Sequence, residues 1–84
     1  MAQWQKFLDR LLSGKSDNNL NFDDVRNLLK RLGFTERIRG SHHVYERTDL
    51  PELVDIQTLK DGKAKAYQIA QIRDLFRKHN ITTI

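Results

Sequence analysis

The four residues Gly40-Ser41-His42-His43 bring together side chains that can do chemistry. A histidine has an ordinary pKa of about 6.5, so its imidazole can take or give a proton near neutral pH. The glycine lets a ligand approach the backbone closely, and the serine adds a hydroxyl suited to contact a phosphate. A histidine in this setting can accept the proton of a ribose 2′-hydroxyl or protonate a leaving 5′ oxygen, the two proton transfers of RNA cleavage.

Positive charge is concentrated in the part of the chain that holds this segment. The 84 residues carry 15 Lys and Arg against 11 Asp and Glu, a net charge of +4. Residues 1–24 hold three of the cations and four of the anions, so residues 25–84 carry +5. Clustered cations release counterions from nucleic acids, which favours binding to RNA or DNA without selecting a sequence. The candidate phosphate contacts are Arg37, Arg39, Lys60, Lys63 and Lys65.

The residue types present exclude several other chemistries. The chain contains no cysteine, which excludes disulfides, thiolate zinc sites and a cysteine nucleophile. His42 and His43 are adjacent, and adjacent side chains on a strand point to opposite faces, so the two cannot grip one metal ion. We therefore expect no metal site and no cofactor. A second acid or base beside a catalytic histidine would be a lysine, a tyrosine such as Tyr45, or water.

Three stretches repeat apolar residues at the spacing of an amphipathic helix. The first covers residues 4–12, and residues 13–19 after it are rich in Gly, Ser, Asp and Asn, which predicts a loop. The second helix follows Asn21, a residue suited to the N-cap, and ends at Gly33, which can adopt a left-handed C-terminal cap. The third covers residues 67–78.

Between the second and third helices the apolar pattern changes to the period of a strand. Strands are predicted at residues 34–39, 42–47 and 53–59, joined by Gly40-Ser41 and by a turn around Pro51. Connections this short permit antiparallel hairpins and exclude parallel crossovers. The sequence therefore predicts an α+β domain in which helices two and three cover one face of a three-stranded antiparallel sheet. The other face stays open and polar, with one histidine of the pair on each side.

Length and hydropathy set the overall organisation. With 84 residues, a single domain is expected over 1–84, with 1–19 as a helical extension and loop and 20–84 as the core. The hydrophobic fraction of 38% predicts one compact core rather than several packed layers. No apolar run approaches the roughly 20 residues of a membrane-spanning helix, and the first residues lack the apolar stretch of a signal peptide. We therefore expect a cytoplasmic protein with no membrane contact.

Three segments of the chain are similar to segments of one known family. They are Leu29-Lys30-Arg31-Leu32-Gly33-Phe34, Arg39-Gly40-Ser41-His42-His43-Val44-Tyr45, and the terminal stretch 72–81. On these segments, residues 22–81 resemble the HicA toxins of HicA–HicB toxin–antitoxin pairs. The resemblance implies a double-stranded-RNA-binding-domain-like fold and metal-independent endonuclease cleavage of mRNA, which inhibits translation in a stress response. It also implies a HicB-like antitoxin that covers the active site.

Within that family the histidine directly after Gly-Ser is catalytic, and this histidine corresponds to His42. The turn residues Gly40 and Ser41 then belong to the RNA-binding surface, and His43 and Tyr45 have supporting or packing roles. A homo-oligomer within the antitoxin complex is one further expectation. The resemblance does not separate a general acid from a general base at His42.

Other functions remain open on the sequence alone. The same basic face would suit a noncatalytic RNA-binding module, or a domain that binds only a partner protein such as the antitoxin. The helix at residues 4–12 lies outside the part that resembles HicA. Its apolar stripe leaves three roles open, namely packing on the domain, seating the antitoxin, or pairing two copies.

Overall fold

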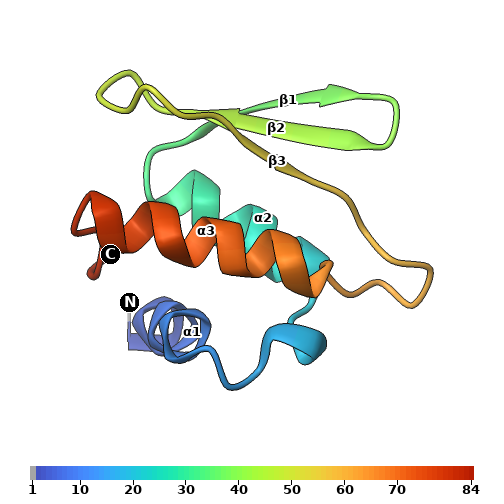
Figure 1. Ribbon diagram of the computed structural model, residues 1–84, viewed down its shortest axis with the longest axis horizontal. Helices are drawn as coiled ribbons and strands as arrows, with labels where there is room; N and C mark the ends of the chain where they lie inside the picture. Colours follow the sequence, from blue (N-terminus) through green and yellow to red (C-terminus); the bar gives the residue numbers. More distant parts are fainter. Residues whose placement is uncertain (1) are drawn as a thin grey trace.

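The computed structural model describes residues 2–84 and has three α-helices on one side of a three-stranded antiparallel sheet (Figure 1). The elements are α1 (Ala2–Ser13), a 3₁₀ helix η1 (Asp17–Asn19), α2 (Phe22–Arg31), β1 (Thr35–Arg39), β2 (His42–Glu46), β3 (Val54–Ile56) and α3 (Ala66–Lys78). The predicted α+β class and the antiparallel hairpins are confirmed. Within residues 2–84, no helix is long and apolar enough to cross a membrane.

The register of the sheet determines which side chains share its open face. The strand order is β1-β2-β3, with Arg39 paired to His42 and Val44 paired to Asp55. Directly paired residues share a face, and successive residues alternate between faces. The open face therefore carries Arg37, Arg39, His42, Val44 and Asp55. The opposite face carries Tyr45, Val54 and Ile56, which are buried against the helices.

The strand β3 is shorter than the strand predicted at residues 53–59. The backbone N–H of Gln57 donates to the side chain of Gln68 at 2.8 Å, and Thr58 forms an isolated bridge with Ala64. The chain leaves the sheet after Ile56 because α3 and its entry segment offer the hydrogen bonds that a neighbouring strand would otherwise supply.

Both predicted signals at the ends of α2 are confirmed. The side chain of Asn21 accepts the backbone N–H of Asp24 at 3.0 Å, as an N-cap does. At the other end, Gly33 has φ +93, and the N–H of Phe34 donates to the carbonyl of Leu29 at 3.0 Å. Since β1 begins at the next residue, this cap sets the angle at which the sheet leaves α2.

The helix α1 forms a third layer beneath α2 and α3, on the side away from the sheet (Figure 1). Leu8 and Leu11 are completely buried and belong to the same core cluster as Leu28 of α2 and Phe76 of α3. The expected single core is observed, since α1 shares one cluster with the rest of the domain. The expectation that no further layer packs on it is wrong, because the apolar stripe of α1 covers the backs of the other two helices. Of the three roles left open for this helix, packing on the domain is the one observed.

The predicted loop at residues 13–19 contains the short helix η1. Both guanidinium NH2 groups of Arg73 in α3 bond the carboxylate of Asp17, at 2.8 and 2.9 Å. A bidentate interaction of this kind fixes the orientation of the two side chains as well as the distance between them. This bond attaches the connection between α1 and α2 to α3. It thereby helps to keep α1 packed against the other two helices.

Candidate active site on the open face of the sheet

The two-residue turn Gly40-Ser41 forms one end of the candidate site. Arg39 and His42 are paired in the ladder, so only these two residues separate β1 from β2. Gly40 has φ +59, in the left-handed region, as the first central residue of a type II′ hairpin turn requires. A Cβ built at Gly40 would meet nothing within 4 Å, so the turn faces open space. His42 thus begins β2 at an accessible end of the sheet.

His42 lies on the open face beside Asp55 of β3. Its Nδ1 atom is 3.0 and 3.1 Å from the two carboxylate oxygens, and both side chains are half exposed. A carboxylate at this distance orients the imidazole and decides which ring nitrogen carries the proton. The pair therefore supplies an oriented, solvent-accessible group for proton transfer.

Gln57 connects His42 to two of the predicted phosphate contacts. Its Nε2 atom lies 3.4 Å from Nε2 of His42 and 3.3 Å from Oγ of Ser41. Its Oε1 atom accepts a hydrogen bond of 3.0 Å from Nζ of Lys65. Because the buried side chain of Gln68 holds the backbone of Gln57, this bridge is fixed to α3. Ser41 and Lys65 are therefore linked to the imidazole through Gln57.

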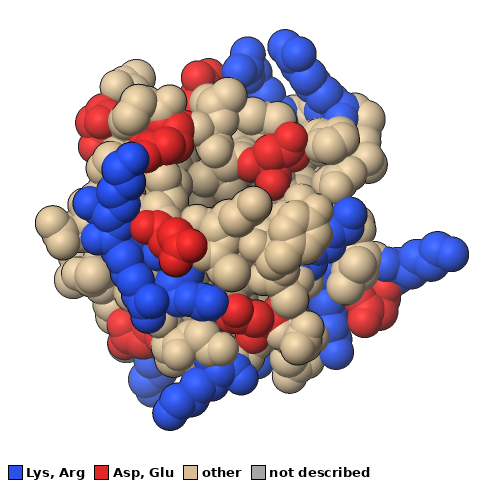
Figure 2. Space-filling view, in the orientation of Figure 1, with Lys and Arg blue, Asp and Glu red and all other residues tan. Residues whose placement is uncertain are grey.

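The remaining predicted phosphate contacts lie on β1 and in the loop between β3 and α3. Arg39 is exposed and directly opposite His42, and Arg37 has a weak surface pair with Glu46 at 3.7 Å. Lys60 and Lys63 lie in the loop between β3 and α3, at the same end of the molecule as the hairpin turn (Figure 1). Figure 2 shows Lys and Arg side chains projecting above the hairpin and beside this loop.

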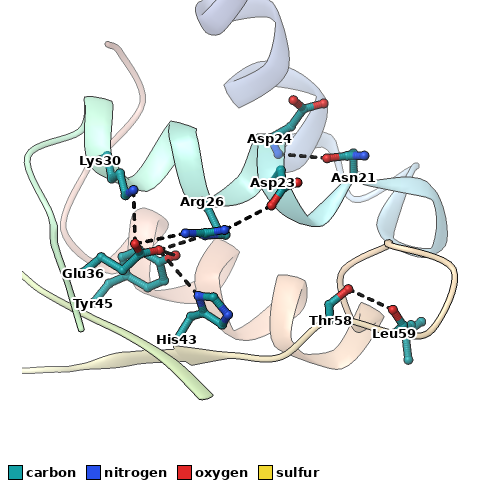
Figure 3. Close-up of polar contacts among 10 residues, drawn as sticks. All are labelled: Asn21, Asp23, Asp24, Arg26, Lys30, Glu36, His43, Tyr45, Thr58 and Leu59. Carbon is teal, nitrogen blue, oxygen red and sulfur yellow. Dashed lines mark hydrogen bonds and ion pairs between the residues drawn. The ribbon is translucent and has the colours of Figure 1, made fainter. Parts of the chain in front are cut away.

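His43 and Tyr45 lie on the opposite face, between the sheet and α2 (Figure 3). Tyr45 is completely buried, and its hydroxyl donates a short hydrogen bond to Glu36. The buried Nδ1 of His43 is 3.6 Å from the same carboxylate, and its ring meets the edge of Phe22 at a centroid distance of 5.0 Å. His43 therefore packs on the inner face of the sheet.

Of the alternatives left open for a second acid or base beside His42, Tyr45 is not placed to serve. The sheet separates the two side chains, because residues at odd spacing on one strand point to opposite faces. Burial, together with the neighbouring carboxylate of Glu36, also raises the pKa of the Tyr45 hydroxyl well above its usual range. Its function in the structure is to anchor β2 to the cluster around Glu36.

Glu36 is the centre of a polar cluster that holds the sheet to α2 (Figure 3). Its carboxylate accepts two hydrogen bonds from Arg26, at 2.9 and 3.1 Å, and one from Lys30 at 3.1 Å. These bonds, with Arg26 foremost, keep the pKa of Glu36 well below its usual range, and Glu36 in turn raises the pKa of Arg26. Because each of these groups bonds another member of the cluster, we assign the cluster a structural role.

The surroundings of His42 form an open surface rather than a cleft. A groove of about 350 Å³ between β3 and α3 reaches Asp55 but does not include His42. Sites for small molecules are usually concave, so an open site suits a long polymer better. Among residues 2–84, no three His, Cys, Asp or Glu side chains are grouped closely enough to hold a metal ion.

Sequence reasoning missed Asp55 and Gln57 as neighbours of His42. The alternation of residues 53–59 already places both on one side of the third strand. What it does not provide is the register between β2 and β3, which decides whether that side is level with His42. The cluster around Glu36 was likewise not predicted, since Arg26 and Lys30 come from α2 and Tyr45 from β2.

Comparisons of the chain with protein-family models, with curated proteins and with solved structures gave no match.

Proposed function

We propose that this protein is an endoribonuclease toxin of the HicA type, which binds mRNA over the open face of its sheet and cleaves it with His42. The observation that carries the proposal is the placement of His42, half exposed and bonded through Nδ1 to Asp55, on the same face as Arg37 and Arg39. An oriented imidazole next to cations matches the needs of phosphodiester cleavage.

The shape and charge of this face support RNA as the substrate. The site is open on the side of the hairpin turn, which leaves room for a strand to run across it. Arg37, Arg39 and the lysines of the loop before α3 provide charge for phosphates on either side of a scissile bond. Ribose supplies the 2′-hydroxyl that an imidazole can deprotonate, which DNA lacks.

The finer parts of the proposal follow from the resemblance to HicA. They are a double-stranded-RNA-binding-domain-like arrangement of residues 20–84, cleavage without a metal ion, and a HicB-like antitoxin that covers His42. The order helix, three antiparallel strands, helix over α2 to α3 is compatible with that arrangement. The helix α1 is an addition to it that completes the core.

Expression in a bacterial host tests the proposal. The wild-type protein is expected to arrest growth, and His42→Ala is expected to relieve the arrest at an equal protein level. His79→Asn, which changes a histidine at the end of α3, is the matched control and should leave the arrest in place. A His42→Ala protein that arrests growth as strongly as the wild type would contradict the assignment of His42.

A further inference from the structure

A chain of hydrogen bonds runs through His42 from a cation at one end to a carboxylate at the other. Lys65 Nζ bonds Gln57 Oε1 at 3.0 Å, Gln57 Nε2 approaches His42 Nε2 at 3.4 Å, and His42 Nδ1 bonds Asp55 at 3.0 Å. Each side chain contacts the next along one edge of the open face. The chemical nature of the two end groups determines where the proton of the imidazole lies.

From the cationic end, the direction of each hydrogen bond is fixed by chemistry. An ammonium group can only donate, so the atom of Gln57 that faces Lys65 must be the carbonyl oxygen. The amide nitrogen of Gln57 then faces His42 Nε2 and Ser41 Oγ, at 3.4 and 3.3 Å. An amide nitrogen can only donate as well, so Nε2 of His42 must accept and cannot carry the proton.

From the acidic end, the same conclusion follows independently. The carboxylate of Asp55 can only accept when ionised, so Nδ1 of His42 must donate to it. The opposite tautomer would place an N–H of the ring against the N–H groups of Gln57. It would also point the lone pair of Nδ1 at a carboxylate, so both ends of the chain would repel it.

We infer that Asp55, Gln57 and Lys65 are positioning residues that hold His42 as the neutral Nδ1–H tautomer, and that His42 acts as the general base through Nε2. This inference rests on the proposed function and decides between acid and base, which the sequence leaves open. The contact between Gln57 and Nε2 is long for a hydrogen bond, so a substrate hydroxyl can replace it.

The reaction step then has a defined proton path. Nε2 of His42 takes the proton of a ribose 2′-hydroxyl, the 2′ oxygen bonds the adjacent phosphorus, and the bond from phosphorus to the 5′ oxygen breaks. The 5′ oxygen takes a proton from water, and the hydroxide left behind takes the proton from Nε2, which restores the neutral ring. The products are a 2′,3′-cyclic phosphate and a 5′-hydroxyl. During the step, the charged ring is stabilised by the carboxylate of Asp55.

The position of the proton can be measured without any RNA. The full chain labelled with ¹⁵N-histidine is examined at pH 8 by two-bond ¹H–¹⁵N correlation, which distinguishes the nitrogen that carries a proton from the one that does not. We expect the proton of His42 on Nδ1. The double variant Asp55→Asn/Gln57→Glu, in which the carboxylate and the amide exchange places around the ring, is expected to move the proton to Nε2. Asp74→Asn, which removes an equal charge from the same groove between β3 and α3, should leave it on Nδ1.

A second arm reads the products and rates of RNA cleavage. Asp55→Asn is expected to slow cleavage at least tenfold, which is part of the roughly 10²–10⁴-fold that general base catalysis contributes. Gln57→Glu is nearly isosteric, but its carboxylate accepts a hydrogen bond from Nε2–H and so favours the tautomer that cannot act as a base through Nε2. It should slow cleavage by a similar factor. Asp74→Asn is expected to match the wild type, and the RNA product should end in a 2′,3′-cyclic phosphate.

The two arms separate this inference from the proposed function. A wild-type proton on Nε2, or a proton that stays on Nδ1 in Asp55→Asn/Gln57→Glu, overturns the inference even if RNA is cleaved. A proton on Nδ1 together with RNA that stays intact overturns the proposed function, and the general-base role falls with it.

Discussion

His42 and His43 are neighbours on β2, yet their imidazoles lie on opposite faces of the sheet. His42 is half exposed and bonds Asp55, whereas His43 is largely buried against Phe22 and Glu36. Strand geometry alone produces this difference, because consecutive side chains alternate between faces. Of the two, only His42 is accessible on the open face, and His43 belongs to the packing that holds β2 against α2.

The cluster around Glu36 should make a large contribution to stability. Glu36→Gln leaves the charges of Arg26 and Lys30 without their carboxylate in a site where the glutamate side chain is only 11% exposed. We expect a loss of roughly 2–4 kcal/mol in the free energy of unfolding, measured by urea denaturation. Glu46→Gln is the control, since its carboxylate has one weak pair on the surface and should cost less than about 1 kcal/mol. Equal losses of unfolding free energy in the two variants would show that the cluster around Glu36 does not stabilise the fold.

The same carboxylate predicts how stability depends on pH. Because the pKa of Glu36 in the folded state lies far below its ordinary value of 4.5, the unfolded chain binds this proton first as the pH falls. The stabilisation is complete above pH 4.5 and is lost progressively as the pH falls from 4.5 toward the depressed folded value. The difference in unfolding free energy between the wild type and Glu36→Gln should therefore shrink between pH 6 and pH 3. A difference that stays constant across this range would contradict the assignment.

The helix α1 should behave as part of the core. Leu8 is completely buried beneath α2 and α3, so Leu8→Ala is expected to lower the free energy of unfolding by about 2–4 kcal/mol. Lys6→Ala on the exposed face of the same helix should change it by less than about 0.5 kcal/mol. If thermal or urea unfolding shows no difference between the two variants, α1 is an appendage and not a layer of the domain.

The sequence was sufficient for much of the fold, for reasons that are local. Asn21 and Gly33 mark the ends of α2 because capping depends on one residue and its immediate backbone. The hydrogen bond between His42 and Asp55 could not be predicted, since it depends on the register between β2 and β3. The burial of α1 was one of three roles that the sequence left open, because periodicity shows that a helix has an apolar stripe but not what the stripe covers.

The open face should account for the salt dependence of RNA binding. Arg39 is exposed directly opposite His42, so Arg39→Ala is expected to weaken binding and to reduce the slope of log affinity against log salt by about 1. The assay uses a labelled RNA in a His42→Ala background, which prevents cleavage, between 50 and 200 mM salt. Lys6→Ala, on α1 at the far side of the helices, should leave the slope unchanged. If Arg39→Ala has no effect on the slope, RNA binds elsewhere.

The role of His42 in RNA cleavage is tested most sharply with a labelled RNA and the purified full chain. The chain is free of any antitoxin, and a metal chelator is present. We predict that the wild type cleaves the RNA, and that His42→Ala binds it equally but leaves it intact while its circular dichroism spectrum is unchanged. RNA that the wild type binds in a salt-dependent manner but never cuts would identify a noncatalytic RNA-binding module instead. Cleavage by His42→Ala at the wild-type rate would show that His42 is not the catalytic residue.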